Sequence, residues 1–192
     1  MKKLHQFHEV FDTQAVFRLL LEGMANPGRK LSVREYAEKL FGDEKSCLAV
    51  AMTLLDNEVS FCVCGDQKLA QDIVLLTHAR QEGHEKADYI FVTDPAMLAE
   101  AVSGGKAGTL ADPHQSATLV LFEAECRKTE ERQLAGPGIA GVVTFAVPEM
   151  LNRAMELRDS REDEYPQGID LIYVSGTGEL LCIPRTTRRE AA

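Results

Sequence analysis

The sequence predicts an α/β protein with three layers, in which a mixed central sheet carries helices on both faces. Strands and helices alternate along the chain, and several strands are apolar without alternation, as in sheets that are covered on both sides. A closing β-hairpin adds antiparallel pairing, which makes the sheet mixed. At 192 residues the chain is predicted to form a single domain, residues 1–192.

Two helices are predicted before the first strand. Asp12 or Thr13 can cap the first helix, because a short polar side chain accepts a hydrogen bond from a free backbone NH at a helix start. Apolar residues follow at helical spacing, and Pro27-Gly28 ends the helix. Residues 43–55 form a second helix that has almost no polar side, so we expect it to be buried.

The next segments repeat a strand followed by a helix. Residues 59–64 have strand composition, and Gly65-Asp66 then opens an amphipathic helix. Residues 89–92 form a second short strand, after which Asp94-Pro95 is typical of an N-cap and a first helical position. We expect this helix to end at Gly104-Gly105.

Strands dominate the remaining part of the chain. Residues 117–122 are largely apolar, which places this strand in the middle of the sheet. Residues 132–135 are a candidate pairing strand, and Pro148 begins a short helix. Residues 169–174 and 180–183 flank a glycine turn and predict the closing β-hairpin.

Charge and composition exclude several classes of function. A formal net charge of -9 opposes binding to nucleic acid, which relies on many Lys and Arg contacts. Apolar runs are much shorter than the roughly 20 residues that cross a bilayer, so we expect no membrane contact. The N-terminus has no apolar stretch behind its lysines and the cysteines are scattered, which favours the cytoplasm. The charged run 158–164 is interpreted as a solvated loop.

Three features suggest chemistry but fit ordinary roles better. Residues 102–109 are glycine-rich around Lys106, yet Ala107 stands where a phosphate loop needs Ser or Thr, so a helix end and a loop are predicted. Cys62 and Cys64 point to one face of a strand, but structural zinc needs four ligands, so we expect buried thiols and no metal. The histidines form no recognisable set with a serine and an acid.

The densest positive segment is the last one. Arg185 and Arg188 flank Thr186 and Thr187, directly after the closing strand. Arginine forks fit phosphate and carboxylate oxygens, and threonine hydroxyls add hydrogen bonds, so the segment is a candidate anion site or partner contact. The alternative is a solvated basic tail.

Five segments in the same order resemble one family, the H subunit (PhnH) of the carbon-phosphorus lyase system. Helix ends and tight turns carry most of the likeness, and the order of the segments is as specific as their content. The segments are FRLLLEGMANPG (residues 17–28), LLDNE (54–58), GPGI (136–139), YPQGIDLI (165–172) and IPRTT (183–187).

The matching positions have mostly structural explanations. Proline and glycine end helices and permit tight turns, and a carboxylate can accept hydrogen bonds within a turn. Arg18 and Arg185 are candidates for ion pairs, interface contacts or an anion site. The positions interpreted as structural are Pro27, Gly28, Gly136, Gly138, Gly168 and Asp170.

The resemblance implies a fold similar to the large domain of pyridoxal-phosphate-dependent transferases, assembled as a homodimer and without the cofactor lysine, so we expect no cofactor. It also implies a cytoplasmic complex whose subunits join a phosphonate to the ribose of ATP with release of adenine. The other carbon-phosphorus lyase subunits are the implied partners. The resemblance supplies no catalytic residue, so we predict a subunit that is not catalytic alone.

Two other functions compete with this prediction. A small-molecule transferase subunit with its own anion site would use Arg18, Arg185 or Arg188 to hold a phosphonate or a nucleotide. An active pyridoxal-phosphate enzyme would use Lys106 as its aldimine lysine, and that reading rests on fold likeness alone.

Overall fold

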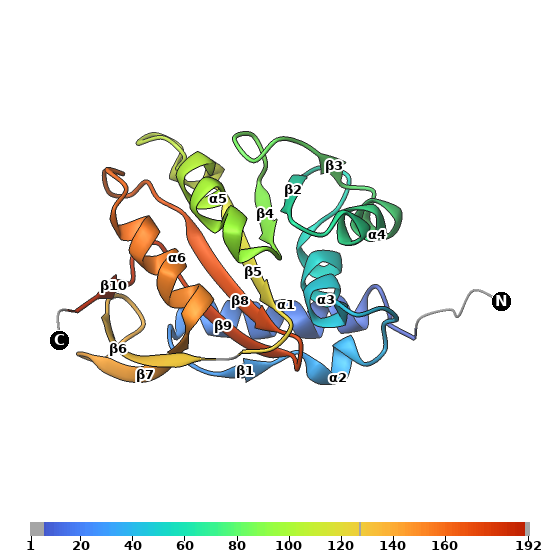
Figure 1. Ribbon diagram of the computed structural model, residues 1–192, viewed down its shortest axis with the longest axis horizontal. Coiled ribbons are helices and arrows are strands. Elements are labelled where there is room, and N and C mark those ends of the chain that lie inside the picture. Colours follow the sequence, from blue (N-terminus) through green and yellow to red (C-terminus); the bar gives the residue numbers. More distant parts are fainter. Residues whose placement is uncertain (1–5, 127, 191–192) are drawn as a thin grey trace.

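The computed structural model describes residues 6–126 and 128–190, and a seven-stranded sheet forms its centre (Figure 1). A separate three-stranded sheet lies at one end of the molecule. The strands are β1 (Leu31–Ser32), β2 (Ser60–Cys64), β3 (Arg80–Gln81), β4 (Tyr89–Val92), β5 (Thr118–Glu123), β6 (Thr129–Ala135), β7 (Val143–Pro148), β8 (Asp170–Ser175), β9 (Glu179–Ile183) and β10 (Arg188–Arg189).

The large sheet is mixed, as predicted. Its strand order is β1-β9-β8-β5-β4-β2-β3. The five strands from β8 to β3 run parallel, whereas β9 and β1 are antiparallel to their neighbours. β5 is the fourth of the seven strands, which confirms the middle position predicted for residues 117–122.

Helices cover both faces of this sheet and complete the three layers. They are α1 (Phe11–Ala25), α2 (Arg34–Ala37), α3 (Lys45–Leu54), α4 (Gln67–Thr77), α5 (Leu98–Gly104) and α6 (Glu149–Asp159), with 3-10 turns η1 (Pro95–Met97) and η2 (Pro113–Gln115). One hydrophobic cluster joins the sheet to α1, α3 and α4, and the other joins it to α5 and α6. None of the helices in the described ranges is long and apolar enough to cross a membrane.

The strands divide their side chains between the two clusters. Along β5, Val120 and Phe122 enter the first cluster while Leu119 and Leu121 enter the second. An apolar run without alternation is therefore what a strand with two buried faces requires. The predicted buried helix is α3, in which every residue from 46 to 52 is buried.

The first helix begins earlier than its predicted caps. α1 starts at Phe11, so Asp12 lies inside the first turn instead of capping it. The Asp12 carboxylate accepts a hydrogen bond from the His8 backbone NH and pairs with Lys39, with Nζ 2.6 Å from Oδ1. The Asp12 carboxylate therefore forms an ion pair with a distant residue instead of the helix cap that the sequence predicts.

The three-stranded sheet, in the order β10-β6-β7, was largely missed. β6 is longer than the predicted 132–135, and β7 and β10 were not predicted. β10 pairs Arg188 with Ala135 and Arg189 with Leu134, so the prediction of a solvated basic tail is wrong for this segment. Two-residue strands depend on partners far along the chain, and no local pattern announces them.

Candidate functional site

Distant segments meet at the amino-terminal ends of the parallel strands. Arg185, which follows β9, holds Asp170 at the start of β8: Nη2 lies 2.5 Å from Oδ2 and Nε 3.2 Å from Oδ1. The Arg185 backbone NH also donates to Oδ1, at 2.7 Å, and Nη1 donates to the Pro113 carbonyl at 2.5 Å. The two side chains are 18% and 19% exposed. This arginine is therefore a structural ion-pair partner that fastens the C-terminal segment to β8.

The predicted anion residues only partly gather in one place. Arg185, Thr186 and Arg188 line a groove of about 500 Å³. Arg188 is exposed, and its side chain has no ion pair or hydrogen-bond partner among the described residues. Thr187 is buried outside the groove, and its hydroxyl has no partner in the described part of the chain. Because the carboxylates of Asp163 and Glu190 line the same groove, its charge is mixed.

The glycines of the matching segments allow these segments to touch one another. Gly138 has φ +84°, and a Cβ there would lie 2.2 Å from the Ala25 carbonyl oxygen at the end of α1. A Cβ on Gly136 would lie 2.9 Å from the Thr186 carbonyl oxygen, and one on Gly168 would lie 3.3 Å from Cβ of Arg185. The turn 136–139 is thus wedged between the end of α1 and the C-terminal segment.

The charged run 158–164 is only partly a solvated loop: Glu162 and Glu164 are exposed, but its two arginines are held by the fold. The Arg158 side chain is 6% exposed and donates to the carbonyl oxygens of Pro184, at 3.0 Å, and Thr187, at 2.7 Å. Arg161 is also largely buried and donates to carbonyl oxygens at the end of α5, including that of Gly105 at 3.0 Å. Arginine can be buried when its guanidinium satisfies several carbonyls, and a charge count along the sequence does not reveal this.

Arg18 lies apart from these residues. It is exposed on the outer face of α1, and its side chain has no ion pair or hydrogen-bond partner within residues 6–126 and 128–190. The structure therefore brings Arg185, Thr186 and Arg188 together with Gly136 but does not add Arg18 to them. Their predicted role in anion or partner binding stays a prediction.

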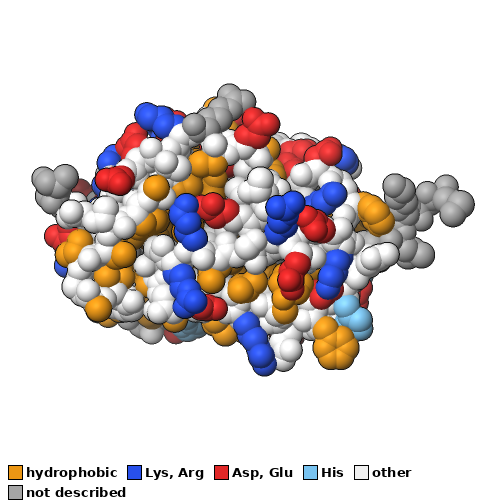
Figure 2. All heavy atoms as spheres, turned by 90° about the horizontal axis from the view of Figure 1, so that it is seen from below, with side chains coloured by type: hydrophobic (Ala, Val, Ile, Leu, Met, Phe, Trp, Pro, Cys, Tyr) orange, Lys and Arg blue, Asp and Glu red, His pale blue; other side chains and the backbone are white. Residues whose placement is uncertain are grey.

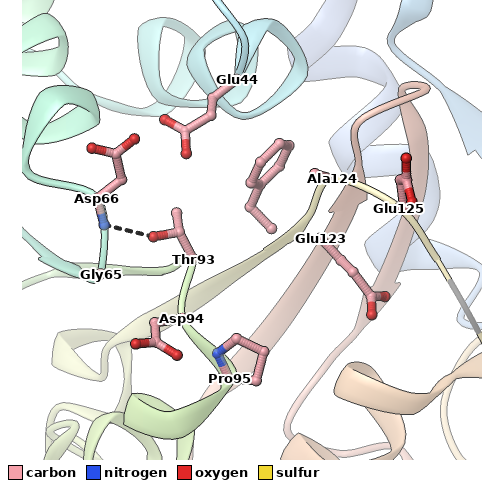
Figure 3. A pocket seen from close by; sticks show the side chains of 10 residues that line it. Glu44, Gly65, Asp66, Thr93, Asp94, Pro95, Glu123, Ala124 and Glu125 are labelled. Atoms are coloured by element: carbon pink, nitrogen blue, oxygen red, sulfur yellow. Dashed lines mark hydrogen bonds between the residues drawn. The ribbon is translucent and has the colours of Figure 1, made fainter.

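The opposite edge of the sheet holds an acidic hollow of about 740 Å³ where the parallel strands β2, β4 and β5 end (Figure 3). Open α/β sheets usually bind their ligands at this edge, often with a phosphate at a helix start. Here five carboxylates line it: Glu44, Asp66, Asp94, Glu123 and Glu125.

Two of these carboxylates occupy the starts of the adjoining helical segments. Asp66 Oδ1 accepts from the Lys68 backbone NH at 2.7 Å and caps α4. Asp94 Oδ1 accepts from the Ala96 backbone NH at 2.9 Å and caps η1. Figure 3 also shows the Asp66 backbone NH donating to Thr93 Oγ1, at 2.8 Å. One NH group at each of these helix starts is thus already bonded to a carboxylate of the protein itself, and the carboxylates occupy the place that a phosphate would take.

Glu44 should make stability depend on pH. Burial, followed by the charge of Asp66, raises the pKa of Glu44 from 4.5 to about 7. Ionisation of the folded state is therefore penalised progressively from about pH 4.5 upward and fully above about pH 7. Glu44→Gln should raise the free energy of unfolding by about 1 kcal/mol at about pH 8, allowing for solvent screening, and by little at about pH 4. Urea unfolding at both pH values checks this.

A matched control for this prediction is Glu125→Gln, which removes an exposed carboxylate from the same lining. The control should change stability by a similar small amount at both pH values. If Glu44→Gln is equally stabilising at low and high pH, ionisation of Glu44 is not the cause.

Lys106 and the cysteine pair lie away from this hollow or inside the core. Lys106 Nζ is 2.5 Å from Asp88 Oδ1; Asp88 directly precedes β4, so the pair lies at the amino-terminal edge of the sheet. Cys62 and Cys64 both pack on the α5–α6 side of β2. Within the described ranges, no group of three or more His, Cys, Asp or Glu residues is placed to hold a metal ion.

The fold defines a three-layer α/β protein. The contacts described above show that its glycine and arginine residues in the turns and the C-terminal segment hold distant parts of the chain together. The chain belongs to the family of bacterial phosphonate metabolism proteins called PhnH, which matches residues 5–190. A protein from Stutzerimonas stutzeri named C-P lyase subunit HtxG is 30% identical over 176 residues, which cover 91% of this chain and 84% of the relative. The PhnH subunit of alpha-D-ribose 1-methylphosphonate 5-triphosphate synthase from Rhizobium meliloti (strain 1021) is 26% identical over 187 residues, 94% of this chain and 92% of the relative.

Sequence reasoning missed Arg158 and the acidic hollow, although signals for both exist. Arg158 continues the spacing of the inward-facing Leu151, Ala154 and Met155, so helical periodicity alone places it on the buried side. Asp66 and Asp94 each follow a predicted strand. If those strands are parallel, both carboxylates must lie at the same edge of the sheet.

Proposed function

We propose that this chain is a docking subunit of a carbon-phosphorus lyase complex and supplies no catalytic group of its own. In this role it supports the transfer of a phosphonate to the ribose of ATP with release of adenine, giving a ribose 1-phosphonate 5-triphosphate. The name of the relative from Rhizobium meliloti supports this reaction, and family membership supports the other lyase subunits as partners. A homodimer in the cytoplasm, with a fold like the large domain of pyridoxal-phosphate-dependent transferases, belongs to the same proposal.

The observation that carries the proposal is the acidic edge of the sheet. A subunit that held ATP in the usual position for its fold would need free helix NH groups or cations there. Instead the edge presents Glu44, Glu123 and Glu125 beside two aspartates that cap their own helical segments. A triphosphate would meet several carboxylates and no cation among the residues that line this hollow. The anionic substrates are therefore better held by the partner subunits.

The exposed apolar side of α1 is the surface we propose for docking. Val10, Phe11, Phe17 and Leu21 are 64%, 68%, 45% and 53% exposed, and the spacing of seven and four residues puts Val10, Phe17 and Leu21 on one face. Figure 2 shows the underside of the molecule, where basic and acidic side chains lie next to one another with hydrophobic atoms between them. Such a mixed surface with large apolar anchors is typical of protein interfaces.

Co-expression with the other lyase subunits tests the proposal. We expect one complex on size exclusion at micromolar concentration, and the double variant Phe17→Glu, Leu21→Glu should weaken its assembly by about tenfold or more, because apolar anchors dominate binding. Leu75→Glu is the matched control, since Leu75 on α4 is 66% exposed but lies on another helix. Separate elution of the wild-type chain would contradict the proposed function.

A second candidate is an anion site of the chain's own, favoured by the exposed, unpaired Arg188 beside Thr186 in the 500 Å³ groove. Calorimetry with ATP and with a simple phosphonate distinguishes it from docking alone. Binding heat that disappears in Arg188→Ala would support this site. Its absence in both the isolated chain and the complex would remove it.

A further inference from the structure

β7 differs from the other free edges of the two sheets in the described structure. The remaining edge strands β1, β3 and β10 have two residues each, and β3 and β10 carry arginine. β7 has six residues, VTFAVP, and none of them is charged. Short or charged edges are the usual protection against pairing with another chain, and β7 lacks both devices. In Figure 1, β7 lies at the margin of the molecule.

The hydrogen-bond pattern leaves alternate residues of β7 without partners. The Glu190 backbone NH donates to the Gln133 carbonyl, so the backbone of Gln133 faces β10. Thr144, which lies opposite Gln133, consequently turns its own NH and carbonyl away from β6, as does Ala146 two residues later. Neither residue has a hydrogen bond outside the β6 ladder within the described ranges. These outward NH and carbonyl groups can form a ladder of hydrogen bonds with one more strand.

We propose that β7 pairs antiparallel with β7 of a second copy of this chain, so that two three-stranded sheets become one continuous sheet. In the central register Thr144 lies opposite its own copy, and their outward NH and carbonyl groups exchange hydrogen bonds. Val143 then lies opposite Phe145, a β-branched and aromatic pair that favours antiparallel pairing. No charged residue of either strand meets another.

Self-complementarity argues for a second copy as the occupant. A two-fold axis through Thr144 makes every contact twice, including both Val143–Phe145 pairs, and such closed two-fold contacts are the commonest form of association. The adjacent Val142 is 53% exposed and would be covered by the same contact. The inference rests on the proposed function and assigns an interface to the homodimer that this function includes.

Thr144→Pro tests the inference because proline removes the outward NH and puts its ring on the free side while the bonds to β6 stay intact. We expect the wild type to sediment at twice 21.2 kDa. The proline variant should dissociate about 100-fold more readily, since the central pair of hydrogen bonds is lost and the ring blocks approach. Thr144→Val is the matched control, which keeps the NH and the β-branched side chain and should remain dimeric.

Hydrogen exchange on the wild type needs no variant and covers the case in which Thr144→Pro does not fold. The amides of Thr144 and Ala146 should be protected in the dimer and exchange rapidly on dilution, whereas that of Phe145, bonded to β6, stays protected throughout. A monomeric wild type, or a dimer whose Thr144 and Ala146 amides exchange rapidly, would overturn the inference. Protection that appears only with the lyase subunits would also overturn it, because a partner's strand would then fill the edge.

The outcome is separable from that of the proposed function. If the wild type is monomeric but still enters the lyase complex, the β7 inference and the proposed homodimer fail, and the docking function stands. If a β7 dimer forms but never enters the complex, the proposed function fails and the inference stands.

Discussion

Replacing Arg158 by methionine should lower the free energy of unfolding by about 3 kcal/mol. The guanidinium donates hydrogen bonds to the carbonyl oxygens of Pro184 and Thr187. These two bonds hold the turn between β9 and β10 in place. Methionine fills part of the space but cannot donate, so two carbonyls lose charge-assisted hydrogen bonds. Urea unfolding followed by circular dichroism measures the change.

Arg153→Met is the matched control, because Arg153 belongs to the same helix but is exposed, and its side chain has no ion pair or hydrogen bond among the described residues. It should change the free energy of unfolding by less than about 0.5 kcal/mol. Equal effects of the two substitutions would show that Arg158 does not fasten the C-terminal segment.

Gly138→Ala should destabilise the fold by about 3–4 kcal/mol. Its φ of +84° is unfavourable for a residue with a Cβ, and the new methyl group would lie 2.2 Å from the Ala25 carbonyl oxygen and 3.0 Å from Cδ of Pro27. The end of α1 and the turn 136–139 would have to separate. Chemical unfolding measures the loss.

Gly141→Ala isolates the steric part of this effect. Gly141 has almost the same φ, +82°, but nothing lies within 4 Å of a Cβ built there. Only the backbone penalty of about 1–2 kcal/mol should remain. If both alanine variants lose the same stability, the contact between the turn and α1 contributes nothing.

Layer structure was predictable from the sequence because it follows from local patterns. The apolar run of β5 has to bury two faces, and Leu119 and Val120 do lie in opposite clusters. Asp94-Pro95 and Gly104-Gly105 likewise mark the start and the end of the η1–α5 segment, as expected. These signals act over a few residues and need no knowledge of the rest of the fold.

Tertiary pairing was not predictable in the same way. Arg185 and Asp170 were both singled out, but nothing in the sequence shows that one holds the other across the β8–β9 hairpin. The pairing of β10 with β6 joins segments some fifty residues apart, and the two residues of β10 have no period to detect. Residue type was therefore enough to identify candidate site residues. Whether such an arginine is a structural ion-pair partner or a free cation depends on its burial and its partners, which only the fold shows.

The order of the strands has a consequence for synthesis. β8 and β9 are made late, yet they lie inside the large sheet, between β5 and β1. Until β8 has left the ribosome, the side of β5 that it will cover stays open, so the nascent chain carries an unpaired apolar strand edge from the synthesis of β5 to that of β8, and β1 has no neighbour until β9 follows. Added chaperones, which cover exposed apolar segments, should therefore improve the yield of folded protein, whereas slower translation of residues 124–175 should lower it because it prolongs the exposure of β5.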